Sequence, residues 1–182
     1  WKLSEWMVRL GHEVSILTAG SIRKGERLLR MEGRNIIELP YMPGRKLPFW
    51  STVAEEFAFN VAARKWLLKN QSGYDLIHMQ GRSGSLFLQN KSRVLTPVVT
   101  TFHGLIEIEK RFSTKNKWVQ TDSRIHQQMA TWFENMALKN ADQLIAVSEE
   151  MERVMRGRHG VAAAKTIKIN KVLTSPVILP IL

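Results

Sequence analysis

The sequence contains no cysteine, and this absence excludes disulfide bridges, thiolate metal sites and a cysteine nucleophile. No apolar run approaches the ~20 residues that span a bilayer, and the N-terminus lacks the charged and apolar regions of a signal peptide. These absences fit a reducing compartment, so we expect a cytoplasmic protein.

Two nucleotide-binding motifs are also missing. The chain has neither GxGxxG nor GxxxxGK[ST], so neither a dinucleotide fingerprint nor a P-loop supports nucleotide binding within it. Histidines and carboxylates do not recur at metal-ligand spacings. The sequence therefore predicts no metal site and no cofactor.

Positive charge is abundant. Lys and Arg number 27 against 16 Asp and Glu, and the net charge of +11 indicates an anionic partner such as nucleic acid, a phosphorylated small molecule or an acidic membrane. The cations are scattered and no helix-turn-helix or RNA-binding motif is present, so nucleic acid is the less favoured partner.

Hydrophobic periodicity predicts alternating helices and strands. Helices are expected at 3–10, 51–70, 83–91, 123–140 and from 149, and strands at 12–20, 35–41, 74–81, 97–103, 142–148 and 166–173. Residues 21–34 are expected to be irregular. Near-continuous apolar strands separated by helices predict an α/β fold, a Rossmann-like doubly wound parallel sheet with helices on both faces.

Helical spacing also predicts which residues of the two long helices face inward. They are Val53, Phe57, Val61 and Leu68 in the first helix, and Ile125, Met129, Trp132, Phe133, Met136 and Ala137 in the second.

Polar side chains occur at the ends of three predicted strands. His78 follows "DLI", His103 follows "VVTTF" and Ser148 follows "LIAV". Ligands of open parallel sheets bind beyond the carboxyl ends of the strands, so these residues are the candidates for a site. Gly104 would let a ligand approach the backbone.

Each candidate has a structural alternative. His103 can transfer a proton or pair with a phosphate, or it can be a satisfied, partly buried turn residue. A core or supporting role is favoured for His78 because it lies within an apolar strand. A helix N-cap is favoured for Ser148, although an N-cap serine can also contact a ligand. His12, His126 and His159 lack supporting neighbours, and Glu134 is expected to be structural.

Four blocks in this order, "LGHEVSILT", "YDLIHMQG", "TPVVTTFHG" and "ENMALKNADQLIAVSEEM", resemble the N-terminal domain of glycosyltransferase family 4. The resemblance implies one half of a GT-B architecture and metal-independent transfer, with retention of configuration, from a nucleotide-diphosphate-sugar to a glycan or lipid-linked acceptor. It implies that His103 lines the interdomain cleft near the donor sugar and its phosphates, where we expect a catalytic role, and that Ser148 lies at the edge of this cleft. With the strand-end argument above, Gly104, His78 and Ser148 are the expected substrate-binding residues.

The resemblance also predicts that the chain is truncated at both ends. Residues 1–165 would form the Rossmann-like domain without its first strand, and 166–182 a truncated last strand and apolar tail. Since the donor site would lie in the following domain, we expect this fragment to be inactive alone.

Two further expectations concern partners. The segment from Arg45 to Lys69 combines cations with aromatics, which suits peripheral binding to an anionic inner membrane face, although a core helix with solvated cations is slightly favoured. The alternatives to a transferase are a basic nucleic-acid-binding module and a non-catalytic Rossmann-like interaction domain.

Overall fold

The computed structural model describes residues 2–20, 25–40, 51–108 and 120–169. The strands are β1 (Val14–Ala19), β2 (Arg27–Met31), β3 (Arg34–Leu39), β4 (Ile77–Gln80), β5 (Val98–Phe102), β6 (Gln143–Ala146) and β7 (Thr166–Lys168). The α-helices are α1 (Lys2–Arg9), α2 (Ser51–Asn70), α4 (Gln120–Asn140) and α5 (Glu149–His159). Short 3-10 helices include η3 (Ser85–Gln89), where a short helix is predicted.

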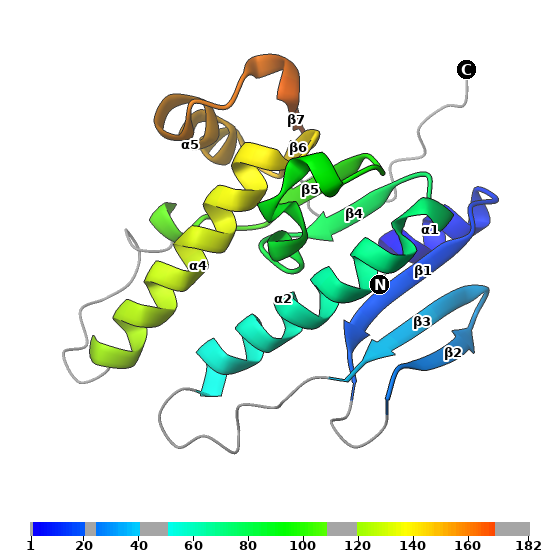
Figure 1. The fold of residues 1–182 in the computed structure, drawn as a ribbon. Coiled ribbons are helices and arrows are strands. Elements are labelled where there is room, and N and C mark those ends of the chain that lie inside the picture. The colour runs from blue at the N-terminus through cyan, green and yellow to red at the C-terminus, as the bar shows by residue number, and fades with distance from the viewer. Residues whose placement is uncertain (1, 21–24, 41–50, 109–119, 170–182) are drawn as a thin grey trace, which may run out of the picture.

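The described strands form two sheets (Figure 1). One is entirely parallel, in the order β4-β5-β6-β7, and the other has the order β1-β3-β2. Helix α2 connects the two sheets in the chain and runs between them in the view of Figure 1, with α4 beside it. The prediction of an α/β fold with parallel strands and intervening helices is confirmed.

Strand β2 is not predicted by the sequence and runs antiparallel to β3. Glu32 and Gly33 link the two strands with φ of 50° and 76°, and two successive left-handed residues suit the twist of a tight hairpin. The expectation of irregular structure at 21–34 is therefore wrong over Arg27–Met31. The usual Asn-Gly or Asp-Gly hairpin signal is absent, which explains the miss.

The parallel sheet separates buried from exposed side chains by strict alternation in β4. Ile77 and Met79 are buried, whereas His78 and Gln80 are exposed. The buried side belongs to the main core, which also contains the fully buried Phe133. Alternate residues of a strand point to opposite faces, so one face of β4 serves packing and the other presents polar groups.

The inward faces of the long helices are only partly as predicted. Phe133, Met136 and Ala137 are buried, but Phe57, Val61 and Trp132 are 47%, 43% and 44% exposed. Among the residues of α2 whose burial is described, 54–70, the buried ones are Asn60, Ala63 and Leu67. Apolar residues occur all round α2, so their spacing alone does not fix which side meets the sheet.

Strand β7 pairs with β6 and confirms the start of the predicted last strand. The apolar tail from 170 and the basic loop 41–50 lie outside the described residues. Within the described part of the chain, no helix is long and apolar enough to cross a membrane.

Candidate functional site

The carboxyl ends of β4, β5 and β6 lie along one edge of the parallel sheet. The register pairs Gln80 with Thr101 and Phe102 with Ala146, so the three strands end at nearly the same level. Loops and helix N-termini meet at such an edge. His78 belongs to β4, His103 directly follows β5, and Ser148 lies two residues after β6.

His103 is the first residue after β5, and its side chain is exposed. Its Nε2 lies 2.8 Å from Oε1 of Gln80, the last residue of β4. The imidazole is thus more exposed than the alternative interpretation expects, although it has a hydrogen-bond partner, as a satisfied turn residue would. It is a surface group held at the sheet edge by a neighbouring strand, with Gly104 half-buried behind it.

His78 belongs to the same polar cluster. Its Nε2 lies 2.7 Å from Oγ1 of Thr101 and 3.4 Å from Nε2 of Gln80. Partial burial lowers the pKa of His78, and the neighbouring His103 lowers this pKa further because two imidazolium charges would repel. His78 is exposed and does not belong to the core. It contacts Gln80, which in turn contacts His103, so its position is that of a supporting residue.

Ser148 is the N-cap of α5. Its Oγ accepts a hydrogen bond of 3.2 Å from the backbone N–H of Met151, and three glutamates occupy the first turn of the helix. The predicted N-cap is confirmed. The described residues show no contact between Ser148 and the cluster around His103.

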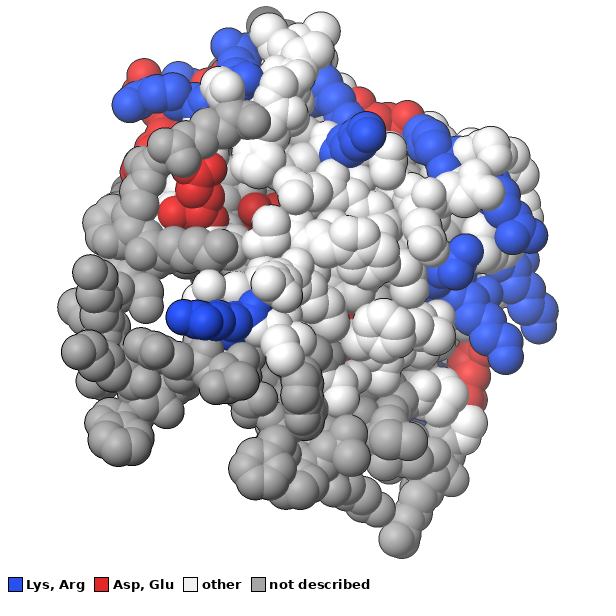
Figure 2. All heavy atoms as spheres, turned by 60° about the vertical axis from the view of Figure 1, so that its left-hand side comes forward, with Lys and Arg blue, Asp and Glu red and all other residues white. Residues whose placement is uncertain are grey.

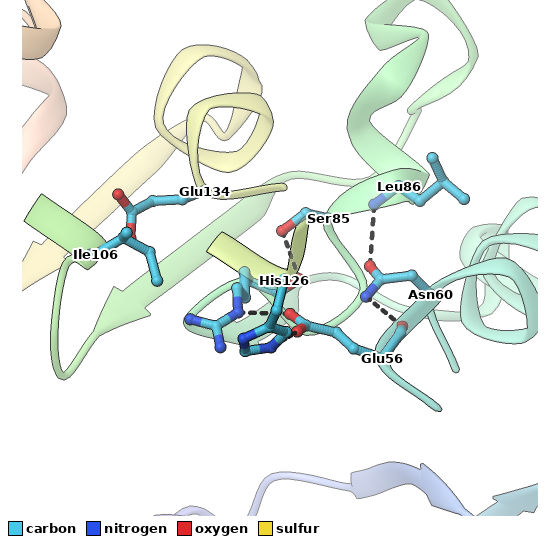
Figure 3. Close-up of polar contacts among 8 residues, drawn as sticks. Glu56, Asn60, Ser85, Leu86, Ile106, His126 and Glu134 are labelled. Atoms are coloured by element: carbon cyan, nitrogen blue, oxygen red, sulfur yellow. Dashed lines mark hydrogen bonds and ion pairs between the residues drawn. The ribbon is translucent and has the colours of Figure 1, made fainter. Parts of the chain in front are cut away.

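Glu134 of α4 supports the loop that carries His103. Although it is almost completely buried, its Oε2 accepts a 2.9 Å hydrogen bond from the backbone N–H of Ile106 (Figure 3). A buried N–H needs such a partner. The structural role expected for Glu134 is therefore confirmed, and it fixes the chain three residues beyond His103.

A second polar cluster joins α2, the loop after β4, and α4 (Figure 3). One Glu56 oxygen lies 2.5 Å from Nε of Arg82, and the other lies 3.2 Å from Nε2 of His126. The expectation that His126 has no supporting neighbour is wrong. Glu56 precedes His126 by 70 residues, so no local pattern connects them.

The loop after β4 is itself held by hydrogen bonds. Ser85 Oγ donates to the carbonyl oxygen of Arg82 at 2.7 Å, and the buried Asn60 of α2 accepts from the backbone N–H of Leu86 at 3.3 Å (Figure 3). The loop geometry therefore holds Arg82 beside Glu56, two residues after Gln80.

A cavity of about 500 Å³ lies elsewhere, at the C-terminal ends of α4 and α5. Lys165 lines it and donates to the backbone carbonyl oxygens of Leu138 and Lys139 at 3.0 and 2.8 Å. Partial burial lowers the pKa of Lys165. Because these bonds terminate α4 at the opposite edge of the sheet, the cavity does not belong to the candidate site.

Among the residues that the structure describes, no group of three His, Cys, Asp or Glu side chains could hold a metal ion. The cluster at the carboxyl edge instead offers imidazoles, an amide and a hydroxyl. Such groups bind and orient polar ligands and transfer protons.

Comparison with known proteins decides the family. The sequence profile described as Glycosyltransferase Family 4 matches residues 1–170. The chain belongs to glycosyltransferase family 4. Its fold is that of the N-terminal domain of a GT-B enzyme. No curated protein matches the chain.

Two solved chains of sucrose-phosphate synthase from Thermosynechococcus elongatus align with 92% of this family 4 domain. One has a TM-score of 0.62 at 22% identity and is covered over 40% of its length. The other has a TM-score of 0.57 at 20% identity and is covered over 80%. These likenesses support the GT-B fold.

Proposed function

We propose that this domain forms the acceptor side of the cleft in a retaining glycosyltransferase. The enzyme would move a hexose from a nucleotide-diphosphate-sugar to a glycan or lipid-linked acceptor. Membership of family 4 supports transfer from a nucleotide-sugar, and the polar carboxyl edge of the sheet supports the location of the site.

His103 is the proposed catalytic residue. The observation that carries this proposal is its exposed imidazole, one residue beyond β5 and held 2.8 Å from Gln80. An imidazole placed there can accept or donate a hydrogen bond to the sugar, and its cation can stabilise charge on the departing phosphate. No metal is required in this mechanism.

Three further residues are proposed to bind substrate or to support its binding. Gly104 would admit a ligand close to the backbone. His78 would act on His103 through Gln80, since both histidines contact that amide. Ser148 would contribute the N-terminus of α5, where free N–H groups suit an anionic ligand.

We also propose peripheral binding to the anionic cytoplasmic face of a membrane. The exposed Phe57 and Val61 on α2 and Trp132 on α4 supply apolar area, and the chain carries a net charge of +11. Figure 2 shows a face with a broad area free of charged side chains, bordered at the top and right mainly by Lys and Arg side chains. Flotation with phosphatidylserine vesicles tests this, because replacing Phe57 and Trp132 by serine should abolish co-flotation.

The catalytic proposal is tested on the complete gene product with radiolabelled nucleotide-sugars. Replacing His103 by alanine should lower kcat/KM by about 10²- to 10⁴-fold, the usual contribution of such a group. The matched control is His12→Ala, which removes an exposed histidine between α1 and β1 and should leave turnover unchanged. Equal turnover of His103→Ala and the parent enzyme would refute the assignment.

A further inference from the structure

Four polar side chains form a continuous hydrogen-bonded network on β4 and at the end of β5. Thr101 contacts His78, His78 contacts Gln80, and Gln80 contacts His103. His78 and Gln80 are two residues apart on β4, and Gln80 pairs with Thr101 in the parallel register. Residues paired in this way share a face of the sheet, so the strand pairing itself brings the four groups together.

The hydroxyl of Thr101 decides the direction of this network. Thr101 is only 7% exposed, and among the described residues its Oγ1 has one hydrogen-bond contact, the 2.7 Å approach to Nε2 of His78. A buried hydroxyl proton without an acceptor is costly. Thr101 therefore donates, and Nε2 of His78 accepts, so the neutral His78 ring carries its proton on Nδ1.

The orientation of the Gln80 amide follows from the protonation of His78. The single lone pair on Nε2 of His78 already accepts from Thr101, but it would still repel an amide oxygen and attract an amide N–H, which makes a second, weaker contact with it. The Gln80 atom 3.4 Å from this nitrogen is therefore the amide nitrogen. The carbonyl oxygen must then face His103, 2.8 Å from its Nε2.

We infer that Thr101, His78 and Gln80 position His103 by fixing its neutral form with the proton on Nε2, so that Nδ1 is the atom that accepts a proton or hydrogen bond from substrate. Gln80 is thus a positioning residue for His103, and the orientation of its amide is set, through His78, by the buried Thr101 on β5. The role of Nδ1 toward substrate rests on the proposed transferase function, but the direction of the network does not.

This arrangement suits acid–base chemistry. When Nδ1 of His103 takes up a proton, Nε2–H still donates to the same Gln80 oxygen, so no neighbouring group has to rotate. In the opposite direction, the Gln80 amide nitrogen would donate to an unprotonated Nε2 of His103. Protonation of Nε2 would then require the Gln80 amide to rotate by half a turn and present its oxygen. The inferred direction therefore keeps His103 in one orientation in both of its charge states.

Histidine NMR of the protein tests the inference without any sugar. The probe is ¹⁵N-histidine-labelled protein in a two-bond ¹H–¹⁵N correlation spectrum, recorded at a pH where all imidazoles are neutral. We expect opposite tautomers, Nδ1–H for His78 and Nε2–H for His103. The exposed His12 serves as the reference for an unconstrained ring.

Isosteric variants then test what sets the direction. Thr101→Val removes the hydroxyl donor, so His78 should no longer be protonated only on Nδ1 and His103 should show a mixture of its two tautomers. Thr101→Ser keeps a hydroxyl and should retain the parent tautomer of each histidine. The control is Thr100→Val, which removes the adjacent buried hydroxyl on the opposite face and should change neither ring. Gln80→Leu removes the acceptor for Nε2–H of His103, so the two tautomers of His103 should mix. Gln80→Glu keeps an oxygen facing Nε2 and should retain the Nε2–H tautomer.

Two results would overturn the inference: His78 protonated on Nε2 in the parent protein, or tautomers that do not respond to Thr101→Val. The outcome is separable from the catalytic test. An intact network with full activity of His103→Ala would remove the transferase role of His103 and leave the network standing. If the tautomers differ from those expected but His103→Ala loses most of its activity, the network inference fails and the catalytic role of His103 stands.

Discussion

The two sheets of this domain differ greatly in how much apolar surface they bury. The parallel sheet β4-β5-β6-β7 lies in a large core with fully buried side chains such as Phe133 and Leu144. The buried cluster at the smaller sheet consists, among the described residues, of Ile37, Leu39 and Ala63. Helix α1, which precedes that sheet, has no buried residue in its described range.

The candidate site lies entirely on the better-packed sheet and its flanking helices. His103 follows β5, and Gln80, the last residue of β4, contacts it. Glu134 on α4 supports the segment after β5 that carries His103. Catalytic groups need a support that does not move when substrate binds. Among the described residues, the more extensive burial therefore lies beneath the candidate site.

The largest predicted effect comes from truncating a core side chain of the parallel sheet. Leu144→Ala removes a fully buried side chain from β6 and should lower the free energy of unfolding by ~2–5 kcal/mol. The matched control on the smaller sheet is Leu28→Ala, which is 66% exposed and should cost less than ~0.5 kcal/mol. Urea titration of both variants measures the difference, and equal losses would remove the contrast.

The next effect concerns the support beneath His103. Glu134→Leu deprives the buried N–H of Ile106 of its acceptor and should cost ~1–3 kcal/mol in unfolding free energy. Glu134→Gln keeps an oxygen that can accept the same bond and should cost less. Hydrogen exchange at the Ile106 amide provides the local measurement. If that amide exchanges no faster in Glu134→Leu, this carboxylate does not hold the loop.

A smaller effect is expected at the start of α5. Ser148→Ala removes the side-chain acceptor for the Met151 N–H and should destabilise the protein by ~1 kcal/mol. Ser148→Asp restores an acceptor at the N-cap and should recover most of this loss in thermal unfolding. Equal stability of the alanine and aspartate variants would contradict the capping role.

The smallest effect is the pH dependence that His78 contributes. Because its pKa is lowered in the fold, the unfolded chain binds more protons between that pKa and about 6.5. The free energy of unfolding should therefore fall as pH decreases through this window and recover above it. His78→Gln should flatten this part of the profile, measured by urea titration between pH 5 and 8. An unchanged slope in His78→Gln would contradict the lowered pKa.

Local sequence patterns were sufficient for the elements that carry the site. Helix α2 has the predicted bounds, and β4, β5 and β6 lie within the predicted strands, because strand formers and helix-breaking residues alternate clearly there. The position of His103 at a strand end follows from the same pattern. The side of α2 that packs inward does not follow from the pattern. It depends on tertiary contacts, such as the hydrogen bond that the Leu86 N–H donates to the buried Asn60 side chain.

The partners of the site residues could not be read from the sequence. Gln80 meets His103 and Thr101 meets His78 only because β4 and β5 pair in one register, which no local pattern specifies. The same holds for Glu56 and His126, which come together only when α2 and α4 pack against η3 and against each other. Sequence reasoning thus places a candidate residue at a strand end and misses the side chains that hold it.

Native-state hydrogen exchange tests most directly whether the site is built on the more stable half. The account predicts that the amides of β5 exchange only through global unfolding, while those of β1 and β2 exchange through smaller openings with a lower free energy. Equal protection in the two sheets, or faster exchange in β5 than in β1, would contradict it.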